Sequence, residues 1–155
     1  MGLQITSHAF NHQERIPTKF TCDGENISPA LHFVGVPENA KSLVLIMDDP
    51  DVPKNLRPDG MYVHWVLWNI DPKTESIAEN SVPVGAVNGT TSADRPGYRG
   101  PCPPDREHRY FFKLYALDTM LALEASSTKS HLEEAIRGHI LTQAELIGLY
   151  DRHRE

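Results

Sequence analysis

Three stretches of the chain carry the hydrophobic patterns of β-strands. Residues 42–47 are almost continuously apolar and stop just before Pro50, which predicts a strand buried on both faces. Residues 61–70 are rich in β-branched and aromatic side chains and indicate a second central strand. Residues 109–117 alternate between the two faces and predict a third. The core of the fold is therefore expected to be a β-sheet.

Two long irregular segments, 50–60 and 88–107, separate these strands. Both contain Pro and Gly, and the second is especially rich in proline. Loops of this length are uncommon inside a compact domain and tend to carry function. The segments are therefore the first places to look for a binding site.

One short helix is expected near the C-terminus. Ser130 is placed as its N-cap, Glu133 completes a capping box, and Gly138 fits the position after its last turn. Its apolar side would consist of Leu132, Ala135 and Ile136. Periodicity alone leaves residues 139–150 ambiguous between helix and strand, and the β-branched residues in this segment favour a strand.

Length and composition support a single domain covering residues 1–155. The 12 prolines and 10 glycines cut the chain into short pieces, which is typical of an all-β domain. A hydrophobic fraction of 39% is enough for a core, so disorder is not expected. The net charge of −6 argues against a nucleic-acid binder, which would need a basic face.

Cysteine usage and the N-terminal residues predict a cytoplasmic protein. Cys22 and Cys102 lie far apart and form no Cys-x-x-Cys pair, so we expect two free thiols rather than a disulfide framework or a zinc site. No apolar segment of the kind used for secretion or membrane spanning stands out in the sequence. A reducing compartment and no integral membrane association are therefore expected.

Three polar clusters lie where strands meet loops. Asp49 follows the first buried strand in the segment DPDVP, His64 lies within the second strand, and His108 and Tyr110 open the third. His108 and Tyr110 are two residues apart, so their side chains should leave the strand on one face. Arg109 should point the other way and form a structural ion pair. Asp49 and His64 each also have an alternative role without function. Asp49 would then lie in a solvated turn, and His64 would be a core residue.

The register of the second strand predicts where His64 points. With a period of two, His64 shares a face with Val66 and Trp68, and Trp65 points to the opposite side.

Three kinds of site are compatible with these residues. The first is an anion pocket in which imidazole and phenol groups donate hydrogen bonds. The second is a hydrolytic site with histidine as base and aspartate as its orienting partner. The third is a metal site made by His64, His108 and Asp49. The sequence contains neither a Gly-x-Ser-x-Gly elbow nor a His-Glu-x-x-His helix.

The clusters taken together resemble the phosphatidylethanolamine-binding protein family. The segments that carry the likeness are DPDVP, YVHWVLWNI, and PCPP followed by HRYFF, supported by CDGENISPAL and GHILTQAELIGLY. The short chain is similar to the bacterial and archaeal branch, often called Raf-kinase-inhibitor-like. The resemblance covers nearly the whole chain.

The resemblance implies a mainly β fold, an antiparallel Greek-key β-sandwich with one or two short peripheral helices. It also implies a small anion pocket at one end of the sandwich. By motif match the residues of that pocket are Asp49, Pro53, His64, Cys102, Pro103, His108 and Tyr110.

We therefore expect non-enzymatic binding of a phosphate-type anion or a phosphorylated lipid headgroup, with no metal and no cofactor. In this hypothesis His64 and His108 donate imidazole N–H bonds, and Asp49 raises the pKa of a histidine so that it stays charged. The alternative function is a hydrolase or metal-dependent enzyme using the same residues. A regulator that binds a kinase or protease partner is a further alternative, and a homodimer is a further implication of the resemblance.

Overall fold

The protein is described here by a computed structural model that covers residues 2–152. Nine strands, one α-helix and one 3-10 helix follow each other along this part of the chain. Their bounds are β1 (Gln4–Thr6), β2 (Glu14–Arg15), η1 (Thr18–Phe20), β3 (Leu31–Val34), β4 (Ser42–Asp49), β5 (Tyr62–Ile70), β6 (Ser76–Ile77), β7 (Val87–Asn88), β8 (His108–Leu117), α1 (Lys129–Ile136) and β9 (Ile140–Tyr150).

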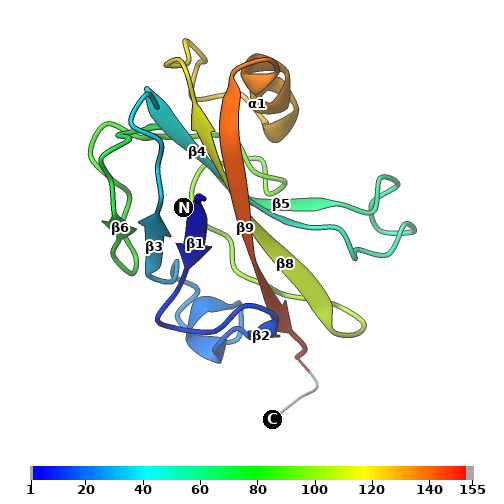
Figure 1. Ribbon diagram of the computed structural model, residues 1–155. Coiled ribbons are helices and arrows are strands. Elements are labelled where there is room, and N and C mark those ends of the chain that lie inside the picture. Colours follow the sequence, from blue (N-terminus) through cyan, green and yellow to red (C-terminus); the bar gives the residue numbers. More distant parts are fainter. Residues whose placement is uncertain (1, 153–155) are drawn as a thin grey trace.

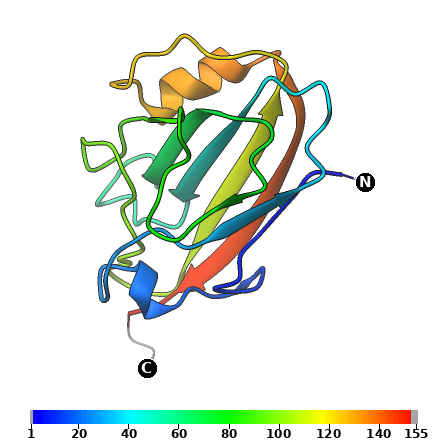
Figure 2. The same ribbon diagram turned by 90° about the vertical axis from the view of Figure 1, so that its left-hand side faces the viewer.

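The strands form two sheets. Six strands in the order β2-β9-β8-β4-β5-β7 make the large sheet, and β1-β3-β6 make the small one. Figure 1 shows the three short strands side by side, and Figure 2 shows β3 running across the long strands, with α1 at one end of the molecule. Neighbouring strands are antiparallel except for the short parallel pair of β2 with β9. The predicted mainly β sandwich is confirmed.

Two clusters of apolar side chains hold these layers together. The larger cluster contains residues of the small sheet, such as Leu31 and Phe33, together with Leu45 and Phe112 of the large sheet, so it lies between the two. The smaller cluster covers the other face of the large sheet, where Leu132 and Ile136 of α1 pack on Val44, Ile46, Val66 and Trp68. The large sheet is therefore buried on both faces at its centre.

The three long strands agree with the hydrophobic pattern. All eight residues of β4 are buried, as a continuous apolar run predicts. β5 and β8 coincide with the second and third predicted strands to within one residue at each end. The ambiguous C-terminal segment is a strand, β9, which pairs along the length of β8.

The predicted direction of His64 was wrong because β5 contains a β-bulge. Met47 pairs with Trp65 while the next residue of β4, Asp48, pairs with Val63, so His64 is an extra residue on β5. The bulge reverses the alternation, and the ring of His64 packs against Tyr110, which belongs to the cluster between the sheets. Trp65 also belongs to that cluster. The bulge therefore turns His64 toward Tyr110 and away from α1.

The helix is present, but its N-cap is not Ser130. Thr128 is the N-cap, and the ring nitrogen Nδ1 of His131 accepts the backbone N–H of Thr128 at 3.1 Å, which completes a capping box. The predicted stop is correct, because Gly138 has φ +83°, the left-handed region that favours glycine.

Candidate functional site

A cavity of about 380 Å³ lies where the ends of β4, β5 and β8 meet the two long loops. The predicted site residues that line it are Asp49, His64, Cys102, Pro103, His108 and Tyr110. The antiparallel register explains why they meet, because the end of β4 pairs with the start of both β5 and β8. Asp49 lies beside Tyr62, and Asp48 beside Phe111.

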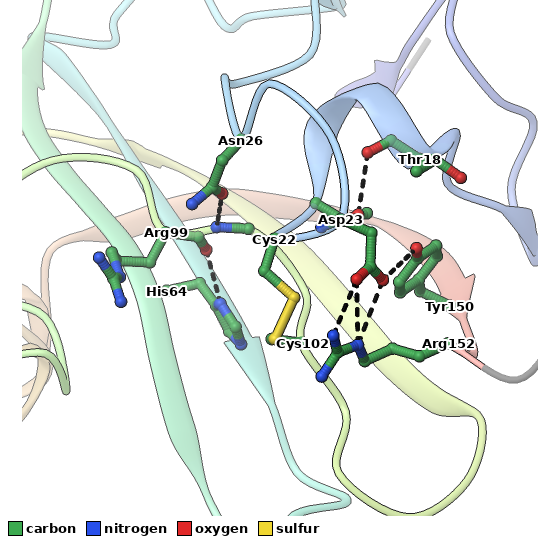
Figure 3. The surroundings of a disulfide bond; sticks show 11 residues. Thr18, Cys22, Asp23, Asn26, His64, Arg99, Cys102, Tyr150 and Arg152 are labelled. Atoms are coloured by element: carbon green, nitrogen blue, oxygen red, sulfur yellow. Dashed lines mark hydrogen bonds and ion pairs between the residues drawn. A yellow bond between two sulfur atoms is a disulfide. The ribbon is translucent and has the colours of Figure 1, made fainter.

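His64 is fixed by the backbone of the loop opposite. Its Nδ1 lies 2.6 Å from the carbonyl oxygen of Arg99, and the N–H of Arg99 donates to the carbonyl of His64 at 3.0 Å. Figure 3 shows the contact between the ring and the carbonyl. Since a carbonyl can only accept, Nδ1 carries the proton and the imidazole is held in one orientation.

His64 is neutral at physiological pH, which contradicts the expectation of a charged donor. Burial is the main cause that lowers its pKa from 6.5 to about 4, and the hydrogen bond to the Arg99 carbonyl opposes this only in part. With its proton on Nδ1, the neutral ring has a lone pair on Nε2. In this state Nε2 can accept a hydrogen bond and cannot donate one.

Cys102 does not have the free thiol that the sequence predicted. It forms a disulfide with Cys22, 80 residues earlier in the chain, and both cysteines line the cavity (Figure 3). The expectation of free thiols failed because sequence distance says nothing about spatial distance. Here η1 and the turn after it bring Cys22 next to the proline-rich loop, with the two Cα atoms 5.5 Å apart.

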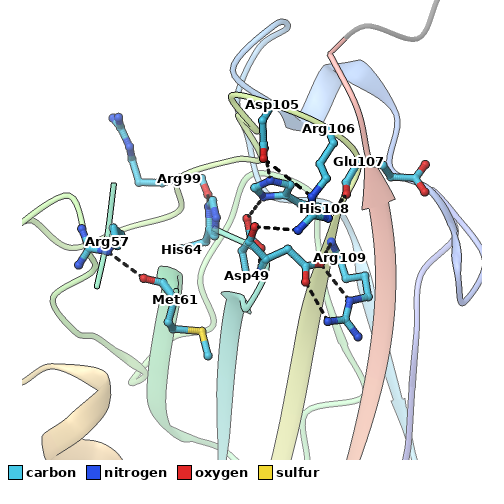
Figure 4. Close-up of polar contacts among 11 residues, drawn as sticks. Asp49, Arg57, Met61, His64, Arg99, Asp105, Arg106, Glu107, His108 and Arg109 are labelled. Carbon is cyan, nitrogen blue, oxygen red and sulfur yellow. Dashed lines mark hydrogen bonds and ion pairs between the residues drawn. The ribbon is translucent and has the colours of Figure 1, made fainter. Parts of the chain in front are cut away.

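His108 lies between two carboxylates. Its Nδ1 is 2.6 Å from Oδ2 of Asp49, and its Nε2 is 2.7 Å from Oδ1 of Asp105 (Figure 4). The ring is fully buried. The expected contact with Asp49 is therefore present, but Nε2 faces a carboxylate of the chain itself rather than open space for a ligand.

Asp49 is held from both sides. Its Oδ2 faces His108, and its Oδ1 accepts the backbone N–H of Asp51 at 2.7 Å. Burial raises the pKa of Asp49, and the hydrogen bond from His108 opposes that shift. The functionless alternative of a solvated turn does not apply, because Asp49 is only 3% exposed.

Tyr110 packs beside both histidines, as its spacing from His108 predicts. Its ring centroid lies 5.3 Å from that of His64 and 6.4 Å from that of His108. Burial, followed by the charge of Asp49 and a hydrogen bond to its carboxylate, raises the pKa of the Tyr110 phenol, which therefore stays protonated.

Arg109 points away from the cavity, as predicted. Its Nε and one terminal nitrogen contact the two carboxylate oxygens of Asp51 at 2.9 and 2.8 Å. This bidentate pair ties the start of β8 to the loop that follows β4. Its role is structural.

The proposed metal set is not assembled. Within residues 2–152 there is no group of three or more His, Cys, Asp or Glu side chains placed to share a metal ion. The geometry gives the reason: Nδ1 of His64 is bonded to a carbonyl, and both nitrogens of His108 face carboxylates.

The sequence model of the family described as phosphatidylethanolamine-binding protein matches residues 6–151. The chain belongs to the phosphatidylethanolamine-binding protein family. A UPF0098 protein of Methanothermobacter thermautotrophicus is 50% identical, over 97% of this chain and 99% of its own length. A UPF0098 protein of Chlamydia trachomatis is 48% identical, over the same shares of the two chains.

Solved structures of this family share the fold. The crystal structure of a putative phosphatidylethanolamine-binding protein homologue from Chlamydia trachomatis has a TM-score of 0.94 at 48% identity, covering 97% of this chain and 98% of that one. Escherichia coli YbcL, described as a new member of the mammalian family, has a TM-score of 0.88 at 28% identity, with the same coverage. The expected family and fold are both confirmed.

Pro53 is the one predicted site residue that does not line the cavity. It acts on the loop instead, since its carbonyl accepts the backbone N–H groups of Leu56 and Arg57 at 2.9 and 3.1 Å. The resulting turn brings both of these residues to the pocket. Pro103, by contrast, is part of the wall, as expected.

The motifs in the sequence did not predict that two arginines belong to the cavity. Arg57 and Arg99 both line the cavity and are half-buried. Nε of Arg57 donates to the carbonyl of Met61 at 2.8 Å, which places its guanidinium over the ring of Tyr62. Only their positions pointed to a role in binding, because Arg57 lies in segment 50–60 and Arg99 in segment 88–107, the two long loops expected to carry function.

In the part of the chain that the structure describes, no helix has the length and apolarity needed to cross a membrane.

Proposed function

We propose that this pocket binds a phosphate-type anion, free or as a phosphorylated headgroup, without catalysing a reaction. The observation that carries the proposal is the gathering of Arg57, Arg99, His64 and Tyr110 around one cavity. The chain as a whole has a net charge of −6, whereas in this cavity two arginines face one carboxylate, that of Asp49, which makes the cavity locally positive.

Each of these groups suits a phosphate in a different way. The two guanidinium groups supply positive charge and several donors in a planar fork that matches phosphate oxygens. The Tyr110 phenol, protonated because its pKa is raised, is a neutral donor that is hydrogen-bonded to Asp49 and has to turn from it to reach a ligand. The neutral His64 supplies an acceptor at Nε2, which suits a protonated phosphate oxygen or the ammonium of a headgroup.

His108 and Asp49 line the cavity and are bonded to each other. The buried pair anchors the start of β8 to the end of β4. His108 lies two residues before Tyr110 in β8. A hydrolase of the serine type would need a hydroxyl nucleophile on the free nitrogen of an Asp-oriented histidine. Here Asp105 occupies that nitrogen, which favours binding over hydrolysis.

The expected affinity is modest. Charge-assisted hydrogen bonds contribute on the order of 1.5–3 kcal/mol each. Two or three of them, after the cost of association, give a dissociation constant of roughly millimolar to micromolar for a small anion. A kinase or protease partner and a homodimer stay predictions. A cytoplasmic location also stays a prediction, and the disulfide removes one of its two grounds, the free thiols.

Isothermal titration calorimetry with inorganic phosphate and with phosphoethanolamine tests the proposal. Arg57→Ala removes one charge from the pocket, and Arg137→Ala removes one from the exposed end of α1, where it pairs with Glu134. We expect saturable binding that Arg57→Ala weakens about tenfold, the loss of one charge-assisted bond. Arg137→Ala should bind like the parent protein.

The two ligands separate the sources of the anion. Equal affinities indicate a free phosphate site, and tighter phosphoethanolamine binding indicates a headgroup site. If neither ligand gives saturable binding, or if both arginine variants bind alike, the proposal is wrong.

A further inference from the structure

The disulfide occupies an unusual place, since it forms part of the pocket wall. Cys22 and Cys102 both line the cavity beside His64 and Arg99 (Figure 3). Cys102 is exposed, whereas Cys22 is half-buried. We therefore expect a thiol from solvent to attack the sulfur of Cys102 rather than that of Cys22.

Hydrogen bonds already hold most of the contact between the two segments that the disulfide joins. The hydroxyl of Tyr98 donates to the carbonyl of Phe20 at 2.7 Å, and the N–H of Gly100 donates to Oδ1 of Asn26 at 2.7 Å. The N–H of Cys22 donates to the carbonyl of Pro101 at 3.1 Å. All of these contacts use residues of the loop that precede Cys102.

The wall segment 102–104 is held differently. Pro103 and Pro104 have no N–H, so they cannot be tied down by donating backbone hydrogen bonds. The next anchor along the chain is the contact of Asp105 with His108. The disulfide thus fixes one end of this short wall, and Asp105 fixes the other.

We propose that the Cys22–Cys102 disulfide is a thiol-exchange site built into the pocket, at which a dithiol opens the wall and weakens anion binding. The effect on anion binding rests on the proposed function. The exchange site itself rests only on the structure. The chain contains two cysteines, so no other pairing competes within it.

The exchange balances with a dithiol as the reductant. Its thiolate sulfur bonds to Sγ of Cys102, the bond between the two cysteine sulfurs breaks, and Cys22 leaves as a thiolate that takes up a proton. The second thiol of the reductant then attacks the reductant sulfur that is bonded to Sγ of Cys102. This closes the ring of the oxidised reductant and releases Cys102 as a thiolate, which takes up a proton. The protein gains two thiols, and the dithiol is oxidised to a cyclic disulfide.

Opening the disulfide should affect the pocket more than the fold. The hydrogen bonds that Tyr98 and Gly100 donate and the one that the carbonyl of Pro101 accepts remain, and residues 102–104 belong to neither apolar cluster. Segment 102–104 loses one anchor, and ordering it again costs binding free energy. Coupling is reciprocal, so a bound anion should also make the disulfide harder to reduce.

The first experiment maps the attack. The native protein is incubated with the monothiol 2-mercaptoethanol, quenched by alkylation, digested and examined by mass spectrometry for the mixed disulfide. We expect the mixed disulfide on Cys102 and the alkyl group on Cys22. Attachment mainly to Cys22, or no reaction until the protein is denatured, would overturn the exchange site.

The second experiment measures the coupling. Inorganic phosphate is titrated by calorimetry into the oxidised protein, the dithiothreitol-reduced protein and the Cys22→Ser/Cys102→Ser variant, with circular dichroism to verify that each is folded. We expect binding about tenfold weaker in the last two, and a smaller reduced fraction of the native protein at equilibrium with a fixed dithiothreitol redox ratio when phosphate is saturating.

The outcomes separate the two claims. Equal phosphate affinity in the oxidised and reduced proteins overturns the coupling and leaves the proposed function standing. No phosphate binding to the oxidised protein overturns the proposed function and the coupling, while the mapping experiment decides the exchange site independently.

Discussion

At the scale of single residues, the site depends on histidines whose nitrogens are already bonded within the protein. His108 uses both nitrogens on carboxylates, and His64 uses Nδ1 on a carbonyl. These contacts fix the orientation of both rings before any ligand arrives. His108 thus joins β4 to β8, and in the proposed function His64 presents one acceptor.

The two carboxylates on His108 should contribute very differently to stability. Asp49 is 3% exposed, so Asp49→Ala leaves a buried imidazole nitrogen without its acceptor and should lower the free energy of unfolding by about 3 kcal/mol. Asp105 contacts the same ring from an exposed loop, and Asp105→Ala is the matched control with a much smaller loss. Urea unfolding at neutral pH measures both. Equal losses would contradict this division of roles.

His64 should make the protein less stable in acid. Its pKa is about 4 in the folded protein and near 6.5 when unfolded, so between these values the unfolded chain binds a proton that the folded protein does not. Stability therefore falls as the pH drops from about 6.5 to about 4, by about 3 kcal/mol in total.

The comparison with His64→Gln isolates this effect. The variant cannot take up the proton, so its unfolding free energy should change about 3 kcal/mol less than that of the parent between pH 7 and pH 4. His139→Gln, at an exposed histidine, serves as the control and should follow the parent. Identical pH profiles for the parent and His64→Gln would show that His64 is not a buried neutral histidine.

At the scale of elements, periodicity predicts the strands but not their irregularities. β4, β5 and β8 are apparent in the sequence because their apolar runs are long. The bulge at His64 depends on how β5 pairs with β4, and single-strand periodicity contains no information about pairing. The direction of His64, and with it the geometry of the pocket, could therefore not be derived from the pattern of β5 alone.

The helix cap is a second case in which local patterns compete. Ser130 with Glu133 and Thr128 with His131 both have the spacing of a capping box, and the first contains the more usual residue types. In the fold, the loop before α1 is tied to Thr90, whose N–H donates to the carbonyl of Ser127 at 2.8 Å. This contact fixes the chain just before Thr128, which becomes the cap.

Substitutions of the two candidate caps test this assignment. Thr128→Ala should lower the free energy of unfolding by about 1 kcal/mol, the usual cost of removing an N-cap. Ser130→Ala, in the first turn and exposed, should cost much less. Thermal or urea unfolding of the two variants gives the comparison. A larger decrease in the free energy of unfolding for Ser130→Ala would show that Ser130 is the N-cap.

At the scale of the whole molecule, the family resemblance predicted more than the residues did separately. It placed Asp49, His64, His108 and Tyr110 together, and the antiparallel register of the large sheet explains how they meet. The disulfide could not be predicted in the same way, because it joins two loops whose distance is set by the complete fold. The contributions of Arg57 and Arg99 likewise depend on how the loops close over the sheet.

The central claim is that this pocket binds a phosphate-type anion, and nuclear magnetic resonance of the histidine side chains tests it most directly. His64 lies in the pocket, whereas His139 is exposed and paired with Asp118, and so provides an internal control. On titration with phosphate or phosphoethanolamine at constant pH, the His64 ring signals should shift and saturate while those of His139 stay constant. His64 signals that do not move, or that move only in parallel with His139, would contradict the account.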